Sequence, residues 1–374
     1  MASAILRYRN PVDVRFGVGS LALLPEVLRG RPAVVITFPE AEATGLLPTV
    51  RSLLGAQLRG IITDIEPNPG VAWVEAHYAD FWARYSDAVV VAIGGGSTID
   101  SAKVLLSRPP TGTFAETLVA LRAGQTPPTA QALPLISIPT TAGTGSEVTP
   151  WATLWDRTAA TPTKLSFHTE ALWSEIALVD PALTLTLPDS VTRVSALDAL
   201  SHALESIWNL NANPVSDALA VEAAGTLIAT LPSLLADPRD LALRTEVSRA
   251  SLLAGLAFSN TKTALAHAIS YPLTLRYGVP HGIACSFTLP LVWSMAQGVS
   301  PARDAVLAEI FGPQETNPTG ALRSFLESVG VDCGFGAYGV SPAEAAAILR
   351  NAAGGARGQN FINTQLCANH STSS

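Results

Sequence analysis

The feature that constrains this chain most is a run of small and β-branched apolar residues that ends in three glycines. Residues 87–93 read Asp-Ala-Val-Val-Val-Ala-Ile, and Gly-Gly-Gly-Ser-Thr-Ile-Asp-Ser-Ala-Lys follows at 94–103. An uninterrupted apolar run of this length is typical of a strand buried on both faces of a parallel sheet. A strand that passes through a glycine turn into a helix predicts an α/β fold.

The first half of the chain repeats this alternation, and the second half does not. Further strands are predicted at 13–16, 33–37, 60–64 and 134–138, and helices at 20–29, 40–58 and 71–84. Residues 108–131 predict a looser insertion, and residues 149–180 alternate strand-like pieces with turns. Helical runs then dominate at 189–208, 214–235, 239–257 and 262–276. We therefore expect an α/β domain with a parallel sheet over residues 1–184 and an all-helical domain over residues 185–374.

Composition excludes several classes of partner. The chain has 374 residues and a net charge of -7, which argues against nucleic acid and against an anionic membrane surface. We see no apolar run that approaches the roughly 20 residues of a spanning helix, and no secretory signal at the N-terminus. The three cysteines, Cys285, Cys333 and Cys367, are scattered and odd in number, as expected for reduced thiols. These features predict a cytoplasmic protein.

Two glycine-rich loops follow predicted strands. In the first, Gly94, Gly95, Gly96 and Ser97 precede a helix, whose free N–H groups and partial positive charge suit a pyrophosphate. The loop departs from G-x-G-x-x-G because Ile99 stands at the third glycine position, so on its own it could equally be a tight structural turn. The second loop, at residues 139–147, reads Pro-Thr-Thr-Ala-Gly-Thr-Gly-Ser-Glu. Loops that follow parallel strands meet at the carboxyl ends of the strands, so the presence of the second loop favours ligand binding at both loops.

A candidate metal site lies between residues 198 and 281. Asp198 and His202 are four residues apart in a predicted helix and therefore project from the same face, and His267 and His281 follow downstream. One carboxylate and three imidazoles suit a divalent first-row metal such as Fe(II) or Zn(II). Taken singly, the Asp-x-x-x-His pair could be a hydrogen-bonded pair, His267 a satisfied core histidine and His281 a turn residue.

Taken together, these motifs resemble the iron-containing (group III) alcohol dehydrogenase family. The order and spacing fit over roughly residues 12–300, and the last 70 or so residues match loosely, mainly at 354–360. The motifs that carry the resemblance are Gly94 to Ser97 with Asp100 and Lys103, Thr140 to Glu147, the Lys-Leu-Ser segment at Lys164, the Asp-Pro turn at Asp180, and the ligands Asp198, His202, His267 and His281.

The resemblance implies a two-domain fold of the dehydroquinate synthase-like type. Residues 1–184 would form the dinucleotide-binding domain and residues 185–374 the metal and substrate domain, with the cofactor in the cleft between them. It implies a bound Fe(II), with Zn(II) as a possible replacement, that polarises the alcohol or aldehyde oxygen. The cofactor-binding residues that it implies are Thr37, Gly94, Gly95, Gly96, Ser97, Asp100, Thr140, Thr141, Thr144, Ser146, Lys164 and Leu183.

Two departures from the family pattern bear on the substrate. Most members have a second histidine four residues after the third ligand, where this chain has Tyr271, a candidate acid or a packing residue. Members commonly read Asn-x-Gly where this chain has Asn260-Thr-Lys262-Thr263. If Lys262 and Thr263 face the metal, the added positive charge favours an anionic substrate; alternatively, Lys262 points to solvent.

The run Lys-Thr-x-x-x-His-Ala-Ile-Ser-Tyr-Pro is similar to phosphonoacetaldehyde reductases of phosphonate biosynthesis. We therefore expect reduction of phosphonoacetaldehyde to 2-hydroxyethylphosphonate, with Tyr271 and Lys262 as catalytic candidates and Lys262, Thr263, Arg276 and Arg357 as substrate contacts. The alternatives are a general iron-dependent dehydrogenase of small alcohols or diols, a dehydroquinate synthase-like lyase, and a silent nucleotide-binding protein.

Cofactor choice and assembly follow from weaker signals. The second predicted strand ends at Thr37-Phe38-Pro39, with no acid before Glu40 to repel a 2′-phosphate, which favours NADPH over NADH. A homodimer is the default expectation by symmetry.

Overall fold

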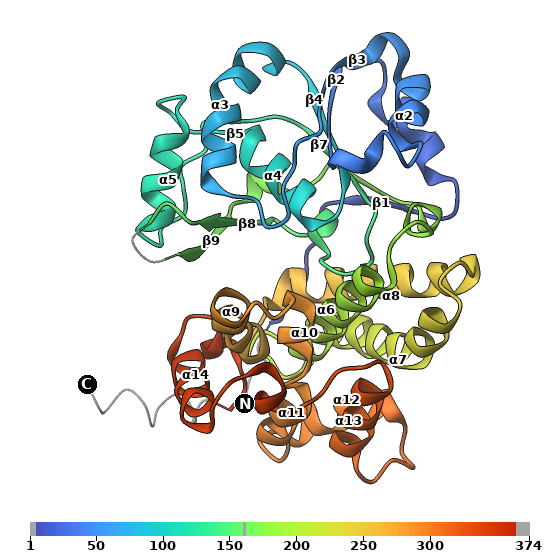
Figure 1. Cartoon of the computed structure of the whole chain (residues 1–374), viewed down its shortest axis with the longest axis vertical. Helices are drawn as coiled ribbons and strands as arrows, with labels where there is room; N and C mark the ends of the chain where they lie inside the picture. Colours follow the sequence, from blue (N-terminus) through green and yellow to red (C-terminus); the bar gives the residue numbers. More distant parts are fainter. Residues whose placement is uncertain (1–4, 160–161, 364–374) are drawn as a thin grey trace. The chain divides into compact units, whose positions relative to one another are not determined.

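The computed structural model describes residues 5–159 and 162–363, so Cys367 lies outside the described residues. The chain divides into two compact units (Figure 1). Of the described residues, the α/β unit comprises 11–141, 146–159 and 162–186, and the helical unit comprises 5–10, 142–145 and 187–363. The predicted division between 184 and 185 therefore misassigned two segments: 142–145 and the described residues before 11 pack with the helices.

The α/β unit is built on a six-stranded sheet in which every pairing is parallel, as predicted. The strand order is β1-β10-β7-β4-β2-β3. The strands are β1 (Asp13–Phe16), β2 (Ala33–Thr37), β3 (Leu58–Ile62), β4 (Val89–Gly94), β7 (Leu135–Pro139) and β10 (Ile176–Val179). All residues of β2, β4, β7 and β10 are buried, which explains their uninterrupted apolar runs.

Helices cover both faces of this sheet. The helices are α1 (Leu24–Leu28), α2 (Leu46–Leu54), α3 (Val71–Tyr85), α4 (Gly96–Leu106) and α5 (Phe114–Arg122). Val34 and Ile36 of β2 belong to the core under α3, α4 and α5, whereas Val35 belongs to the core under α1 and α2. Figure 1 shows α2 and α3 on opposite sides of the strands. Alternate residues of one strand thus fill two separate cores.

The segment 108–131 is more ordered than predicted. It contains α5, whose Phe114, Leu118 and Leu121 are buried at the i, i+4, i+7 positions of one helix face. The prolines and threonines that flank this short apolar stripe are typical of loops, which is why the sequence predicted an insertion without a helix. Two small antiparallel pairs complete the unit, β5 (Ser107–Arg108) with β6 (Gln131–Ala132) and β8 (Trp151–Asp156) with β9 (Thr163–His168).

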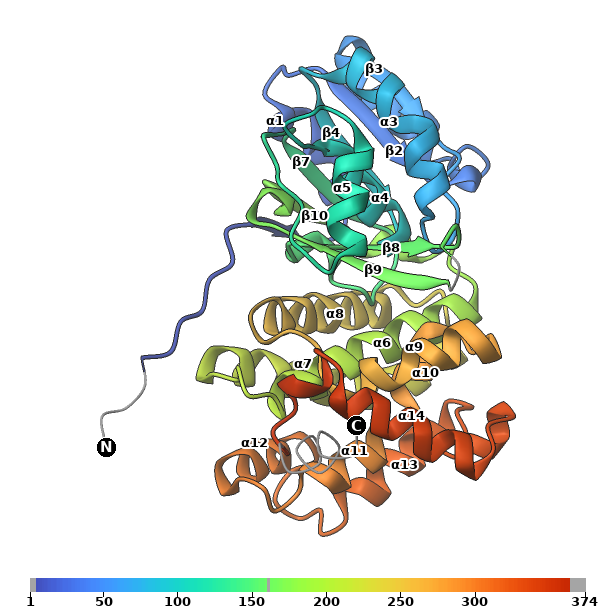
Figure 2. The same cartoon turned by 90° about the vertical axis from the view of Figure 1, so that its left-hand side faces the viewer.

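The helical unit contains α6 (Asp189–Ile207), α7 (Pro214–Ala236), α8 (Leu241–Thr261), α9 (Leu265–Tyr277), α10 (His281–Ser286), α11 (Leu289–Ala296), α12 (Pro301–Phe311), α13 (Pro318–Ser328) and α14 (Pro342–Gly354). Helices α6, α7 and α8 pack against one another, and α10 packs on α6 (Figure 2). The predicted helix over 262–276 begins later, because Lys262 at the end of α8 adopts a φ of 67° and breaks the helical path. Thr263 therefore lies in a loop and not one helical turn before His267.

Helix α7 also corrects an expectation. By length and composition, this 23-residue helix is apolar enough to cross a membrane, although no such run was foreseen. Its Ala220, Ala223, Leu227 and Leu231 are fully buried in the core of the helical unit. Of the most apolar 18-residue window of this helix, 33% is buried, so packing in the core accounts for part of its apolar composition.

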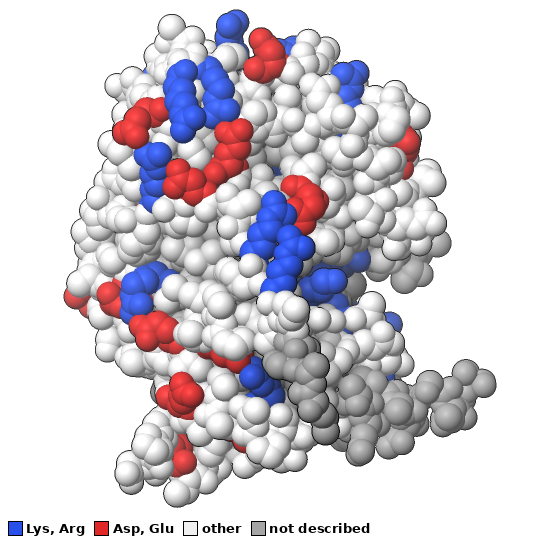
Figure 3. Space-filling view, turned by 180° about the vertical axis from the view of Figure 1, so that it is seen from behind, with Lys and Arg blue, Asp and Glu red and all other residues white. Residues whose placement is uncertain are grey.

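The surface carries charges of both signs. Figure 3 shows one face on which basic and acidic side chains lie beside one another and do not gather into a single basic patch. Pairs such as Arg249 with Glu222 and Glu246, each 2.8 Å apart, illustrate this neutralisation.

Candidate metal centre and cofactor loops

The four predicted metal ligands converge inside the helical unit. Asp198 and His202 project from α6, His267 from α9, and His281 is the first residue of α10. One oxygen of Asp198, Oδ1, lies 3.8 Å from Nε2 of His202, 3.4 Å from Nε2 of His267 and 4.0 Å from Nε2 of His281. Asp198, His202 and His267 are buried, whereas the His281 side chain is 28% exposed. His281 is therefore the most accessible of the four.

These distances fit a bound divalent metal. With bonds of about 2.1 Å, two ligand atoms lie about 3.0 to 4.2 Å apart for angles between 90° and 180°. Within the described part of the chain, Asp198 Oδ1 and His267 Nε2 are buried without a hydrogen-bond partner. Buried polar atoms are normally paired, so two such atoms 3.4 Å apart point to a cation that would satisfy both.

Glu205 orients His267 and was missed in the sequence. Its carboxylate is fully buried, and its Oε2 lies 2.6 Å from His267 Nδ1. It also accepts backbone N–H bonds from Ala264, Ala266 and His267, which begin helix α9. A carboxylate that holds Nδ1 leaves Nε2 for the metal and makes the imidazole a stronger ligand. Glu205 stands seven residues after Asp198 and therefore on the same face of α6, and this spacing is the feature of the sequence that could have predicted its role.

His202 is oriented by a backbone carbonyl oxygen, as His267 is by Glu205. Nδ1 of His202 lies 3.3 Å from the carbonyl oxygen of Gly143. Gly143 approaches α6 so closely that a Cβ there would lie 2.5 Å from the carbonyl oxygen of Ser195. A glycine is thus required for this contact. The imidazole of His202 is further fixed by stacking on Phe258, with ring centroids 4.0 Å apart.

The electrostatics of the centre favour metal binding. Burial opposes ionisation of Asp198, but the neighbouring His202 and the other imidazoles hold its pKa below the usual range, so it remains a carboxylate. Burial lowers the pKa of His202 to about 4, which keeps a lone pair free for coordination. Burial also opposes a charge on His267, yet Cys285 and Glu205 raise its pKa, so a metal displaces a proton there.

The helical unit also brings three predicted substrate residues into one pocket. The pocket has a volume of about 480 Å³ and is lined by α9, α14 and the residues that follow α14, including Tyr271, Arg276 and Arg357. The Tyr271 ring stacks on that of His281 at 6.3 Å, and the Arg357 guanidinium lies 5.4 Å from the centroid of the Tyr271 ring. Arg357 also donates to the hydroxyl of Thr263, which is buried. Tyr271 thus connects a metal ligand to an arginine.

Lys262 lies apart from this arrangement. Its side chain is exposed, and it does not belong to the described residues that line the pocket. Its carbonyl oxygen accepts a hydrogen bond from Asn209. The expectation that Lys262 faces the metal assumed a helix through 262–267, and the positive φ at this residue ends that helix.

In the α/β unit, the first glycine loop has the predicted form. Strand β4 ends at Gly94, and α4 begins at Gly96, so the first N–H groups of the helix lie at the carboxyl edge of the sheet. A Cβ at Gly94 would lie 2.3 Å from the hydroxyl of Thr98, so only glycine fits there. The hydroxyl of Ser97 accepts the N–H of Asn68, and the N–H of Thr140 donates to Gly94, which ties the two loops together.

Asp100, Lys103 and Ser146 form a closed network behind these loops. The Asp100 carboxylate accepts from the Ser146 hydroxyl at 2.6 Å and from the N–H of Thr153 at 2.8 Å. The fully buried Lys103 ammonium donates to the carbonyl oxygens of Ser146, Thr149 and Trp151. Burial lowers the pKa of Lys103 to about 8. Asp100 and Ser146 therefore position the loop and have their bonding atoms occupied.

The remaining predicted cofactor residues differ in accessibility. The Thr37 side chain is fully buried, and its hydroxyl donates to the carbonyl of Ile93 at 2.7 Å, so it is not available to a cofactor. Leu183 packs partly buried against the core of the sheet, and the Lys164 ammonium lies 5.7 Å from the Trp155 ring centroid. Thr141 is half-buried, and so is Thr144, which lies in the segment that packs with the helical unit.

Known proteins share these features over most of the chain. Residues 11–181 match the iron-containing alcohol dehydrogenase family, and residues 192–366 match the C-terminal part of the same family. The long-chain-alcohol dehydrogenase 1 of Geobacillus thermodenitrificans is 34% identical over 332 residues, which is 87% of this chain and 80% of that protein. The sulfoacetaldehyde reductase of Bilophila wadsworthia is 29% identical over 331 residues, 84% of this chain and 82% of that protein.

A solved structure agrees with the fold. The sulfoacetaldehyde reductase of Bifidobacterium kashiwanohense, in complex with NAD+, superposes with a TM-score of 0.87 and 27% identity, covering 99% of this chain and all of that one. Such relatives are oxidoreductases acting on CH–OH groups, and neither a lyase nor a silent nucleotide-binding protein is supported. The matched family models, which together span most of the residues from 11 to 366, show that the chain belongs to the iron-containing alcohol dehydrogenase family.

Proposed function

We propose that this enzyme reduces a small aldehyde that carries a tetrahedral anion, phosphonoacetaldehyde, to 2-hydroxyethylphosphonate. The observation that carries the proposal is the pocket in which Arg276, Arg357 and Tyr271 lie together, with Tyr271 stacked on the ligand His281. Glu344 also lines the pocket and interacts with Arg276, so the proposal assigns the anion to Arg357. Two phosphonate oxygens can accept a bidentate pair of bonds from its guanidinium, whereas an aliphatic aldehyde offers no such group. Two relatives named sulfoacetaldehyde reductase support a substrate of this shape.

The reaction transfers a hydride from the nicotinamide to the carbonyl carbon and a proton to the carbonyl oxygen. The bound metal, held by Asp198, His202, His267 and His281, would supply Lewis-acid polarisation of the carbonyl. Arg357 would hold the anionic end and so orient the aldehyde. The Tyr271 hydroxyl, four residues after His267 in α9, is the proposed proton donor to the oxygen, since a phenolic hydroxyl carries a proton that it can donate.

For the cofactor we propose NADPH. Support comes from the end of β2, where Thr37, Phe38 and Pro39 are uncharged and Glu40 lies in the short 3-10 helix that follows (Pro39–Ala41). An acid that reaches the ribose favours NAD over NADP. The ratio of kcat/KM for NADPH and NADH tests this, and preference for NADH would overturn it. We further propose a cytoplasmic homodimer.

A general dehydrogenase of small alcohols is the second candidate. It is favoured by the 1-propanol dehydrogenase of Salmonella typhimurium, which is 32% identical over 84% of this chain. In that case the arginines of the pocket would have no role in substrate selection, and charged and neutral aldehydes would be reduced alike.

The deciding experiment compares substrates with the Fe(II)-loaded protein. We expect phosphonoacetaldehyde to exceed propionaldehyde in kcat/KM by about 100-fold, or about 2.7 kcal/mol of transition-state preference. Sulfoacetaldehyde is included to rank the two anions. Arg357→Ala should remove most of the preference and leave propionaldehyde reduction unchanged. Arg350→Ala on the exposed side of α14 is the matched control, and Lys262→Ala tests the exposed lysine.

Two results would overturn the phosphonate proposal. Equal reduction of propionaldehyde by the wild-type protein would leave a general aldehyde reductase. A preference for sulfoacetaldehyde of tenfold or more, about 1.4 kcal/mol, would keep the anion pocket but assign it to a sulfonate.

A further inference from the structure

The segment that joins α8 to α9 contains a strained residue. Lys262 adopts a φ of 67° and a ψ of 171°, a backbone conformation that is almost confined to glycine. Another residue persists in such a conformation only where the surrounding structure fixes it. The support for Lys262 is found in the backbone groups of residues 261–263.

Three asparagine side chains hold this turn. The consecutive carbonyl oxygens of residues 261–263 accept hydrogen bonds from the amide groups of Asn211, Asn209 and Asn360, at 3.2, 3.1 and 2.8 Å respectively. These donors stand 50, 53 and 97 positions away in the chain. On the other side of the turn, Glu205 accepts the N–H groups that begin α9. Segments distant in the sequence therefore fix the turn on both sides.

The turn places the hydroxyl of Thr263 against an arginine of the pocket. Thr263 is 2% exposed, and its hydroxyl accepts a hydrogen bond from Nη1 of Arg357. Arg357 is one of the described residues that line the pocket, and Thr263 is not. Thr263 therefore contacts the arginine and not a molecule bound in the pocket.

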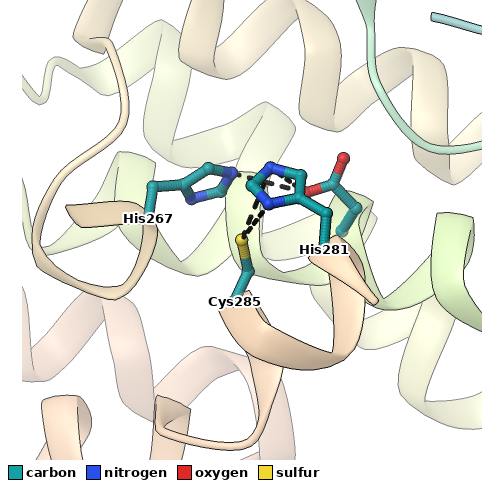
Figure 4. A group of neighbouring side chains, drawn as sticks. His267, His281 and Cys285 are labelled. Carbon is teal, nitrogen blue, oxygen red and sulfur yellow. Dashed lines mark hydrogen bonds and ion pairs between the residues drawn. The ribbon is translucent and has the colours of Figure 1, made fainter. Parts of the chain in front are cut away.

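The guanidinium of Arg357 lies at one end of a row of rings that reaches the metal centre. It lies 5.4 Å from the centroid of the Tyr271 ring, which stacks on the His281 ring at 6.3 Å. His281 also contacts His267, with ring centroids 5.6 Å apart, and Cys285, whose Sγ lies 3.7 Å from both of its ring nitrogens (Figure 4). The position of the guanidinium therefore sets how far a bound anion lies from His281.

We propose that Thr263 is a positioning residue, which holds the Arg357 guanidinium over the Tyr271 ring and so sets the preference for an anionic aldehyde. An unrestrained arginine loses rotamer freedom when it binds an anion, and this loss weakens binding. A hydroxyl in a fixed turn removes part of that freedom before the substrate arrives. The inference rests on the proposed function, because Arg357 is the residue to which that function assigns the anion.

The first test separates KM from kcat in the Fe(II)-loaded protein. Thr263→Val removes the hydroxyl with little change in shape. Its KM for phosphonoacetaldehyde should rise on the order of tenfold, as expected for the loss of one hydrogen bond to a charged group, while kcat is unchanged. Thr263→Ser keeps a hydroxyl and should restore the wild-type KM.

Thr261→Val is the matched control. The hydroxyl of Thr261 is buried in the same turn, but it donates to Ser206 at 3.2 Å. We expect a wild-type KM in this variant. An unchanged KM in Thr263→Val overturns the proposal. So does an equal rise of KM in Thr261→Val, because that result would reflect a general disturbance of the turn.

A thermal double-mutant cycle tests the contact without any substrate. The melting temperatures of Thr263→Val, Arg357→Ala and the double variant are compared with that of the wild-type protein. A direct contact makes the loss in the double variant smaller than the sum of the two single losses. Additive losses overturn the positioning of Arg357 by Thr263.

Failure of the proposed function would be seen in a different protein, the wild type. A wild-type protein that reduces phosphonoacetaldehyde and propionaldehyde alike overturns the anion pocket itself. A wild-type preference that Thr263→Val retains in full leaves the anion pocket standing and overturns the role of Thr263.

Discussion

The two units bury charged side chains in opposite ways. In the α/β unit, Lys103 is fully enclosed, and its ammonium and the Asp100 carboxylate are satisfied by the protein itself. In the helical unit, Asp198 Oδ1 and His267 Nε2 are also buried, and neither has a hydrogen-bond partner among the described residues. A satisfied network maintains a structure by itself, whereas an unsatisfied one requires a ligand. The difference distinguishes the residues that position a loop from those of the candidate metal centre.

The largest expected effect comes from breaking the satisfied network. Lys103→Met leaves the carbonyl oxygens of Ser146, Thr149 and Trp151 without their buried donor, which should cost about 3 kcal/mol. The melting temperature of the α/β unit should fall by roughly 6–12 °C. Differential scanning calorimetry measures this, with the half-buried Lys164→Met as control. Metal affinity should not change, and a loss of metal in Lys103→Met would contradict the separation of the two networks.

Glu205→Gln should weaken the metal centre by an intermediate amount. The amide cannot accept all the bonds that the carboxylate receives from His267 Nδ1 and the start of α9, so His267 loses its fixed orientation. We expect metal affinity to fall 10- to 100-fold, measured by competition with a chelator. Glu222→Gln on α7 is the exposed control. If Glu205→Gln lowers the melting temperature but leaves the metal affinity unchanged, Glu205 stabilises the start of α9 and does not orient a metal ligand.

The smallest effect is a pH dependence in the α/β unit. Burial raises the pKa of Glu147 from its ordinary 4.5 to about 7. Because the unfolded chain loses this proton at lower pH, the contribution of Glu147 to stability is present below about pH 4.5 and is lost as the pH rises through 7. The melting temperature of Glu147→Gln relative to wild type should therefore rise by a few degrees between pH 5 and pH 8. A constant difference over that range would contradict the raised pKa.

Local sequence patterns predicted much of the fold and part of the candidate metal centre. Uninterrupted apolar runs predicted β2, β4 and β7 because a strand buried on both faces needs apolar residues at every position. Asp198 and His202 were paired correctly on one face because helical period alone brings i and i+4 together. These features depend on neighbours in the sequence, so they could be predicted without knowing how the elements pack.

The sequence by itself thus determined the parallel sheet, the helical second half and a candidate metal centre at which Asp198 lies beside His202, His267 and His281. Tertiary structure decided what surrounds them. Glu205 meets His267 across 62 positions, Arg357 meets Tyr271, and Gly143 joins the helical unit to reach His202. The positive φ at Lys262 that ends α8 was also invisible in the sequence. Such contacts arise when segments that are distant in the sequence pack together, and the periodicity of a single helix or strand does not predict that packing.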